Sequence, residues 1–160
     1  MENIKFRIVM ENGGILEGEA YPEVAPKTVD NFVKLIKENF YDGIIFHRVI
    51  RGFMIQGGDP SGTGAGGSEE TIPGEFLSNG FVNNLKHTRG VLSMARTMDP
   101  NSASSQFFIM HQDAPHLDGQ YAAFGKLTSG FEVLDEIAET ETDYRDKPYE
   151  PQVIKTIELI

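Results

Sequence analysis

The chain has 160 residues, of which 39% are hydrophobic, which is enough apolar sequence for the core of one domain over residues 1–160. It contains no cysteine, which excludes disulfides, thiolate metal sites and cysteine nucleophiles. The formal net charge is −10 and the 14 Lys and Arg form no basic stripe, so nucleic acid is not expected as a partner.

The first third of the chain predicts a β-hairpin followed by a helix. Apolar and polar residues alternate over 4–10, a glycine-containing turn comes next, and 15–21 supplies the return strand. Pro26 suits the first turn of a helix, which we expect over residues 26–39. The apolar face of this helix, at spacings of three and four, consists of Val29, Phe32, Val33 and Ile36. We therefore predict a helix packed on a sheet.

Residues 46–59, FHRVIRGFMIQGGD, combine two apolar runs with an arginine. Strand alternation in the first run places Phe46, Arg48 and Ile50 on one face, so Arg48 would share a face with large apolar groups. The second run, 53–56, ends in Gly-Gly-Asp. The two runs predict an apolar surface that carries one cation and one amide. The alternative for Arg48 is an exposed charge on an edge strand, because most arginines are exposed.

The loop at 60–67 contains the G-x-G-x-x-G pattern of dinucleotide-binding sites. Such a site needs a helix directly after the loop, and Pro73-Gly74 would interrupt a helix there. We therefore interpret this segment as a mobile surface loop.

The second half of the chain predicts short strands and one more helix. We expect the strands at 91–95, 106–110, 121–127 and 153–159. Ser129 and Glu132 form a capping box for the helix. Its buried face is expected to consist of Phe131, Leu134, Ile137 and Ala138. Many short strands, two helices and no βαβ alternation predict a mainly β fold, either a closed antiparallel barrel or a sandwich with helical caps.

Three ordered motifs resemble the hallmarks of the cyclophilins, the cyclosporin-binding peptidyl-prolyl cis-trans isomerases. They are FHRVIRGFMIQGGD at 46–59, GVLSMARTMDPNSASSQFF at 90–108, and the stretch from Leu-Asp-Gly to Phe-Gly at 117–125. Three motifs spread over nearly the whole chain are more specific than any one of them. The resemblance implies a closed eight-stranded antiparallel β-barrel with an α-helix at each end, and a site on the outside of the barrel.

The resemblance also implies roles for individual residues. Arg48 matches the catalytic arginine, and Gln56 is placed to orient it. The positions that match substrate-binding residues are the proline-pocket walls Phe53, Met54, Phe108 and Leu117, the polar Gln106, the backbone-binding segment Ala95, Arg96 and Thr97, and His116 and Tyr121. For the apolar members of this set the alternative is ordinary core packing.

Some positions depart from the pattern that is common in eukaryotic members. His116 stands where a tryptophan often sits, Tyr121 where a histidine often sits, and Arg96 where an asparagine often sits. The loop at 97–105 is one residue longer. These changes resemble the bacterial branch of the family, and they imply weak binding of cyclosporin.

The spacing of other reactive residues favours neither a metal site nor a serine hydrolase. The four histidines, His47, His87, His111 and His116, form no H-E-x-x-H motif and no i, i+4 pair. No serine lies in a Gly-x-Ser-x-Gly elbow. Rotation about an X-Pro bond crosses a barrier of roughly 18–20 kcal/mol but makes and breaks no covalent bond. We therefore expect no cofactor and no metal.

The sequence thus predicts a peptidyl-prolyl cis-trans isomerase that acts on proline-containing peptides and unfolded chains and assists protein folding. The alternative is a non-catalytic binder or chaperone of proline-containing segments, and the presence of Arg48 favours the enzyme. No apolar run reaches the roughly 18 residues of a membrane helix, and the N-terminal residues do not resemble a signal peptide. We expect a monomeric, cytoplasmic protein that does not contact the membrane.

Overall fold

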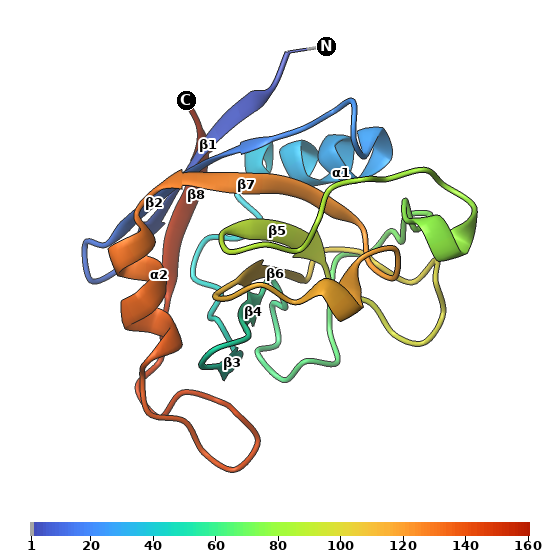
Figure 1. The fold of residues 1–160 in the computed structure, drawn as a ribbon. Coiled ribbons are helices and arrows are strands. Elements are labelled where there is room, and N and C mark those ends of the chain that lie inside the picture. Colours follow the sequence, from blue (N-terminus) through green and yellow to red (C-terminus); the bar gives the residue numbers. More distant parts are fainter. Residues whose placement is uncertain (1) are drawn as a thin grey trace.

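The computed structural model describes residues 2–160, which form one strongly curled antiparallel sheet with two α-helices packed against it (Figure 1). The strands are β1 (Ile4–Met10), β2 (Ile15–Ala20), β3 (Arg48–Ile50), β4 (Met54–Gly57), β5 (Val91–Met94), β6 (Phe107–Met110), β7 (Ala123–Ser129) and β8 (Ile154–Leu159). The α-helices are α1 (Pro26–Lys37) and α2 (Phe131–Ala138), and short 3₁₀ turns form at Leu77–Asn79 and Pro115–Leu117. The expected mainly β fold of eight antiparallel strands and two helices is confirmed.

The sheet is a half-barrel, not a fully closed barrel. Its hydrogen-bonded order is β3-β4-β6-β5-β7-β2-β1-β8, so β3 and β8 are its two edges. Irregular backbone crosses the gap: Phe46 N–H donates to the carbonyl of Gln152 at 3.0 Å, and Ile45 forms a single bridge with Val153. The prediction of a closed barrel was therefore an overstatement. The segment before β3 turns, so it does not continue the strand pairing from β3 to β8.

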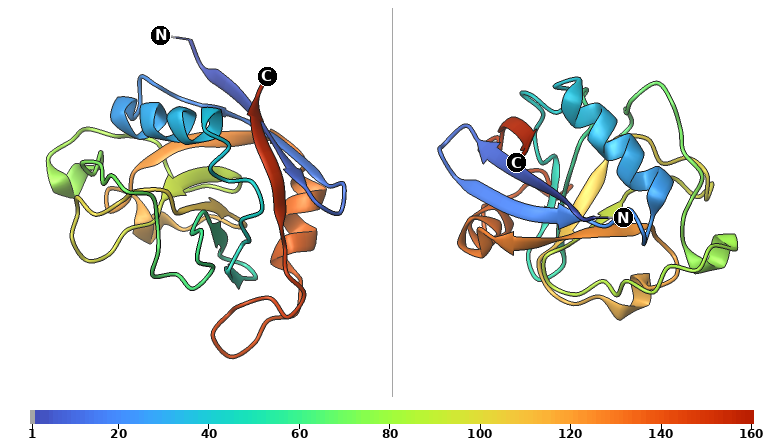
Figure 2. Two further views of the ribbon diagram at one scale, coloured as in Figure 1. Left: turned by 180° about the vertical axis from the view of Figure 1, so that it is seen from behind. Right: turned by 90° about the horizontal axis from the view of Figure 1, so that it is seen from above.

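The interior of the half-barrel is apolar and aromatic. The Phe32 ring of α1 lies 5.4 Å from Phe6, 5.8 Å from Phe107 and 5.0 Å from Phe124, measured between ring centroids. Val29 and Ile36 are buried beside it, whereas Val33 is half-buried. This packing confirms the expected helix on a sheet. Figure 2 shows that the two ends of the chain leave from the neighbouring strands β1 and β8.

The start of α2 differs from the expected capping box. Gly130 occupies the N-cap with φ = 87°, no side chain caps the helix, and Ser129 is the last residue of β7. A Cβ at Gly130 would collide with the carbonyl of Ile15, so only glycine fits this turn. The Ser129 hydroxyl instead donates to Glu17 at 3.5 Å. The buried face of α2 is otherwise as expected, with Leu134, Ile137 and Ala138 buried and Phe131 half-buried.

The central stretch is less regular than its alternation suggested. Strand β3 begins only at Arg48, and Phe46 before it is fully buried in the interior core. Arg48 therefore shares its outer face with Ile50 but not with Phe46. Among residues 2–160, no helix has the length and apolar character needed to cross a membrane.

Candidate active site

A row of outward-facing residues crosses four neighbouring strands. Arg48 of β3 pairs with Gln56 of β4, Gln56 pairs with Phe108 of β6, and Phe108 pairs with Ser93 of β5. Because side chains alternate between the faces of a strand, this register puts the cation, the amide and the ring side by side on the outside of the half-barrel.

A cavity of about 160 Å³ lies over this row, and we call it the apolar cavity because most of its lining residues are aliphatic or aromatic. It is lined by Arg48, Phe53, Met54, Gln56, Ala95, Arg96, Phe108, Leu117 and Tyr121. Met54, Phe108 and Leu117 are buried and pack in a second apolar cluster, separate from the interior core. Drug-sized ligand pockets span roughly 300–1,000 Å³, so this cavity suits one small side chain and not a cofactor.

A second, more polar cavity of about 340 Å³ adjoins the first and shares Gln56, Ala95 and Arg96 with it. Thr97 and Gln106 line this neighbouring cavity instead of the apolar one. His116 lines neither, but its exposed imidazole stacks on the Phe53 ring at 5.9 Å with an interplanar angle of 28°. The structure thus gathers all the site residues named from the sequence on one face.

A chain of amide hydrogen bonds orients Arg48. Its Nη1 donates to Oε1 of Gln56 at 3.3 Å, and Nε2 of Gln56 donates to Oε1 of Gln106 at 2.9 Å. Nε2 of Gln106 in turn donates to the carbonyls of Gly64 at 3.0 Å and Gly66 at 2.7 Å. Each amide uses its oxygen as acceptor and its nitrogen as donor, so the chain fixes both amide orientations. Within residues 2–160 the Arg48 fork makes no other hydrogen bond, so its remaining N–H groups are available to a substrate.

The glycine-rich loop that ends this chain is organised by Asp59. The buried Asp59 carboxylate accepts the backbone N–H groups of Ser61 at 2.8 Å, Gly64 at 2.7 Å and Gly66 at 3.1 Å. Burial alone would raise the pKa of Asp59, but these hydrogen bonds lower it to about 2. A Cβ at Gly66 would collide with the carboxylate. The glycines therefore let the loop wrap around its own carboxylate, and they do not cradle a phosphate.

Arg96 forms part of the wall between the two cavities. Its guanidinium lies between the rings of Phe76 and Tyr121, 4.7 Å from each centroid. Nη1 donates to the Thr97 carbonyl at 2.9 Å and Nη2 to the Gln120 carbonyl at 2.6 Å. Cation–π stacking thus holds Tyr121 in place against the cavity. The sequence contained no signal for the partnership with Phe76, which lies 20 positions earlier in a segment without periodicity.

A buried polar network supports Phe108 from below. Nδ1 of His87 lies 3.0 Å from Asp118 and Nε2 lies 2.8 Å from the Ser93 hydroxyl, while the imidazole stacks on Phe108 at 6.0 Å. Burial lowers the pKa of His87, although Asp118 opposes this shift, which favours the neutral ring. These atoms are connected in the order of a hydrolase triad. However, Ser93 is fully buried, so a substrate cannot reach its hydroxyl.

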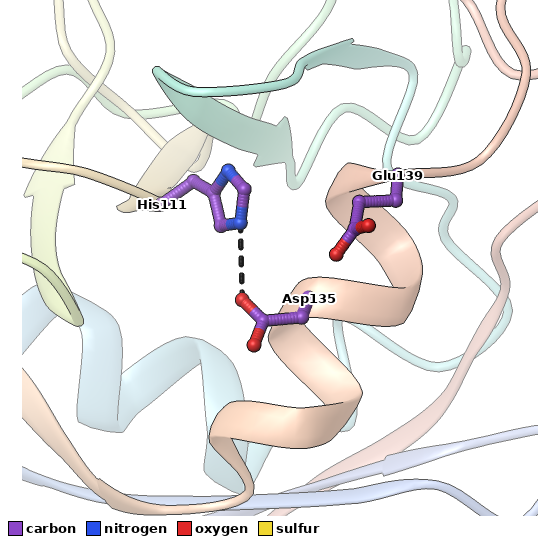
Figure 3. A group of neighbouring side chains, drawn as sticks. All are labelled: His111, Asp135 and Glu139. Atoms are coloured by element: carbon purple, nitrogen blue, oxygen red, sulfur yellow. Dashed lines mark hydrogen bonds and ion pairs between the residues drawn. The ribbon is translucent and has the colours of Figure 1, made fainter.

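The described residues also bring His111 together with Asp135 and Glu139 (Figure 3). The geometry does not suit a metal. Nδ1 of His111 accepts the Gly52 N–H at 2.9 Å, so Nε2 carries the proton that it shares with Asp135 at 3.0 Å. Both oxygens of Asp135 also accept from Arg89, which holds the pKa of that carboxyl below its usual range. The cluster instead anchors the turn between β3 and β4 that carries Phe53.

Comparison with known proteins gives consistent results. The sequence model of the family described as "Cyclophilin type peptidyl-prolyl cis-trans isomerase/CLD" matches residues 5–159. Peptidyl-prolyl cis-trans isomerase ppi1 of Schizosaccharomyces pombe is 48% identical, covering 88% of this chain and 90% of its own. Peptidyl-prolyl cis-trans isomerase B of Bacillus subtilis is 51% identical, and the match covers 78% of this chain and 83% of that protein.

Solved structures agree with this match. The cyclophilin type peptidyl-prolyl cis-trans isomerase cgd2_1660 of Cryptosporidium parvum superimposes with a TM-score of 0.91 at 38% identity, over 99% of this chain and 98% of that one. A second structure of the same protein, in the presence of the dipeptide Ala-Pro, gives a TM-score of 0.89 at 38% identity, over 98% of each chain. The motifs, the half-barrel and these matches agree, and the chain belongs to the family of cyclophilin-type peptidyl-prolyl cis-trans isomerases.

Proposed function

We propose that this isomerase rotates X-Pro bonds in the apolar cavity, with Arg48 as the catalytic residue. One observation carries the proposal. On the outer face of the sheet, the guanidinium of Arg48 is oriented by Gln56 and lies beside the apolar cavity, whose volume suits one proline ring. Phe53, Met54, Phe108 and Leu117 form the walls that would hold the proline ring.

The mechanism needs only binding that favours the twisted amide. As the X-Pro bond rotates, the amide loses its resonance and the nitrogen becomes pyramidal and basic. The Arg48 fork can hold the substrate carbonyl and donate toward that nitrogen, and Gln56 fixes its direction. Interactions that are stronger in the twisted form than in the planar one lower the barrier without a covalent intermediate.

The neighbouring polar cavity suits the rest of the substrate. Ala95, Arg96 and Thr97 run along it, and it is also lined by Gln106, which directly precedes β6. We propose that the backbone next to the proline lies here. The Cryptosporidium parvum neighbour was solved in the presence of the dipeptide Ala-Pro, which contains one X-Pro bond.

Methyl NMR with Ala-Pro tests the position of the site. We expect the Met54 methyl resonance to shift on titration, because this side chain lines the apolar cavity. Met10 is the internal control, since it is buried in the interior core on the other face of the sheet. A shift of the Met10 methyl resonance without a shift of the Met54 resonance would show that Ala-Pro binds outside the apolar cavity.

We further propose that residues 1–160 act as a single, monomeric, cytoplasmic domain on peptides and unfolded chains, without a cofactor, and that cyclosporin binds weakly. Support for the cofactor-free mechanism comes from the small cavity and from the occupied nitrogens of His111. The alternative of a non-catalytic binder is not favoured, because Arg48 and its supporting amides are all present.

We expect the isomerase activity to be unchanged by metal chelators. No step of bond rotation uses a metal, and the ring nitrogens of His111 already share hydrogen bonds with Gly52 and Asp135. The measurement is a proline-limited peptide assay before and after treatment with EDTA. Loss of activity that added zinc restores would contradict this expectation, and His111→Gln would then show whether the cluster in Figure 3 is responsible.

A further inference from the structure

A third cavity, of about 420 Å³, lies on the other side of Arg48. It is lined by His47, Arg48, Gln56, Gly62, Thr63, Gly64, Asp143, Arg145 and Lys147. It shares Arg48 and Gln56 with the apolar cavity. A substrate held at the proline cavity would therefore have flanking residues within reach of this space.

The lining is basic, although the whole chain carries a formal charge of −10. Three cations, Arg48, Arg145 and Lys147, face one carboxylate, Asp143. Within residues 2–160, none of the three cations has a carboxylate within ion-pair distance, whereas arginines on other faces do, such as Arg89 with Asp135.

The backbone fixes the segment that carries two of these cations. The N–H of Asp143 donates to the Lys147 carbonyl at 2.9 Å, and the N–H of Asp146 donates to the Asp143 carbonyl at 3.0 Å. The resulting turn is docked on β3, where the Val49 N–H donates to the Asp146 carbonyl at 2.7 Å. The Asp143 carboxylate also accepts the N–H groups of Arg145 and Lys147, at 2.8 and 3.0 Å. The fold therefore holds the cations beside Arg48.

A buried histidine in the lining responds to these charges. His47 is 6% exposed, and its Nδ1 has no hydrogen-bond partner among the described residues. Burial lowers the pKa of His47; Asp59 opposes the shift, while Arg48 and Lys147 both add to it. Arg48 and Lys147 thus act electrostatically on the imidazole at the base of the cavity, although its Nδ1 is itself buried.

We propose that this cavity binds an anionic side chain of the substrate, a carboxylate or a phosphate monoester, within about three residues of the proline. The inference rests on the proposed function, because it assigns a substrate class to the same site. Arg48 and Gln56 line both cavities, and extended residues advance about 3.3–3.6 Å each, so the residues that flank the proline lie near this cavity. Arg145 and Lys147 supply a fork and a point charge, which both suit these anions.

Matched peptides test the inference. Each peptide carries glutamate, glutamine, phosphoserine or serine at one of the three positions before or after the proline, and kcat/KM for isomerisation is measured. We expect about three- to tenfold faster turnover of the anionic peptides at the best position, since one or two partly exposed ion pairs contribute factors of this size. The ratio of glutamate to phosphoserine turnover distinguishes the carboxylate from the phosphate.

Three variants locate the effect. In R145Q/K147Q we expect the ratio of kcat/KM for the anionic peptide to kcat/KM for its neutral counterpart to fall toward one. The matched control K5Q/K27Q removes the same charge from residues outside this cavity and should keep the preference. Asp143→Asn removes the one carboxylate of the lining, retains an oxygen that accepts the two N–H groups, and should increase the preference.

The possible outcomes separate the two proposals. Equal turnover of anionic and neutral peptides, or a preference that survives in R145Q/K147Q, would overturn this substrate class. An equal loss in K5Q/K27Q would overturn it too, because net charge would then explain the effect. Failure of the proposed function is a different result, namely no catalysed rotation of any of the neutral peptides.

Discussion

Replacement of Arg48 by alanine is expected to lower kcat/KM for a neutral proline-containing peptide by about 10² to 10³ and to leave the fold intact. The side chain is exposed on β3, so its loss opens no cavity in the core. It does remove the donors that we assign to the twisted amide, and donors aimed at a transition state typically contribute about 3–4 kcal/mol. Because those donors act in the transition state, the loss should fall on kcat more than on KM.

Two further variants sharpen the test of Arg48. Arg51→Ala is the matched control: this arginine lies three residues along, is exposed, and pairs only with Glu139 at 3.5 Å among the described residues. It should retain nearly full activity. Arg48→Lys keeps the charge but loses the planar fork, and most of the activity should be lost with it. Near-normal turnover by Arg48→Ala, with an unchanged melting temperature, would move the catalytic group elsewhere.

Local periodicity was sufficient to predict much of the fold. The alternation in β1 and the stripe on α1 each report on one buried face, and a single segment contains all the information needed. The closure of the barrel could not be predicted in this way, because it depends on whether residues 43–46 pair with β8, more than 100 positions later. The start of α2 was misjudged for a similar reason. The contact of Gly130 with Ile15 is invisible in the local sequence.

The site shows the same division between local and long-range information. The motifs supplied the residues that we propose for the site, apart from His116, which directly precedes the third motif, because those residues occur in three short segments. They did not reveal how the segments meet: the row from Arg48 to Ser93 depends on the pairing register of four strands. Nor did they reveal that Arg96 stacks on Phe76, or that His111 receives the Gly52 N–H. Those contacts depend on tertiary packing, and they decide which groups remain free for a substrate.

Cyclosporin is expected to inhibit this enzyme only weakly, and His116→Trp is expected to tighten inhibition by about thirtyfold. His116 is exposed and stacks on Phe53 at the rim of the apolar cavity. An indole offers more apolar area than an imidazole and an N–H donor, and a lost aromatic anchor with its hydrogen bond commonly costs on the order of 2 kcal/mol at an interface. The inhibition constant for cyclosporin, measured with a small proline peptide, gives the size of the effect.

Turnover of the same peptide by His116→Trp should stay within a few fold of the parent, because a short substrate depends mainly on the proline cavity, whose lining does not include His116. His116→Phe separates the two contributions. It adds apolar area without a donor, so its inhibition constant should fall between those of the parent and the tryptophan variant. Tight inhibition of the unmodified protein, or no gain with tryptophan, would show that the side chain at position 116 does not contact the inhibitor. A gain with phenylalanine equal to that with tryptophan would assign the whole effect to apolar area and none to the N–H donor.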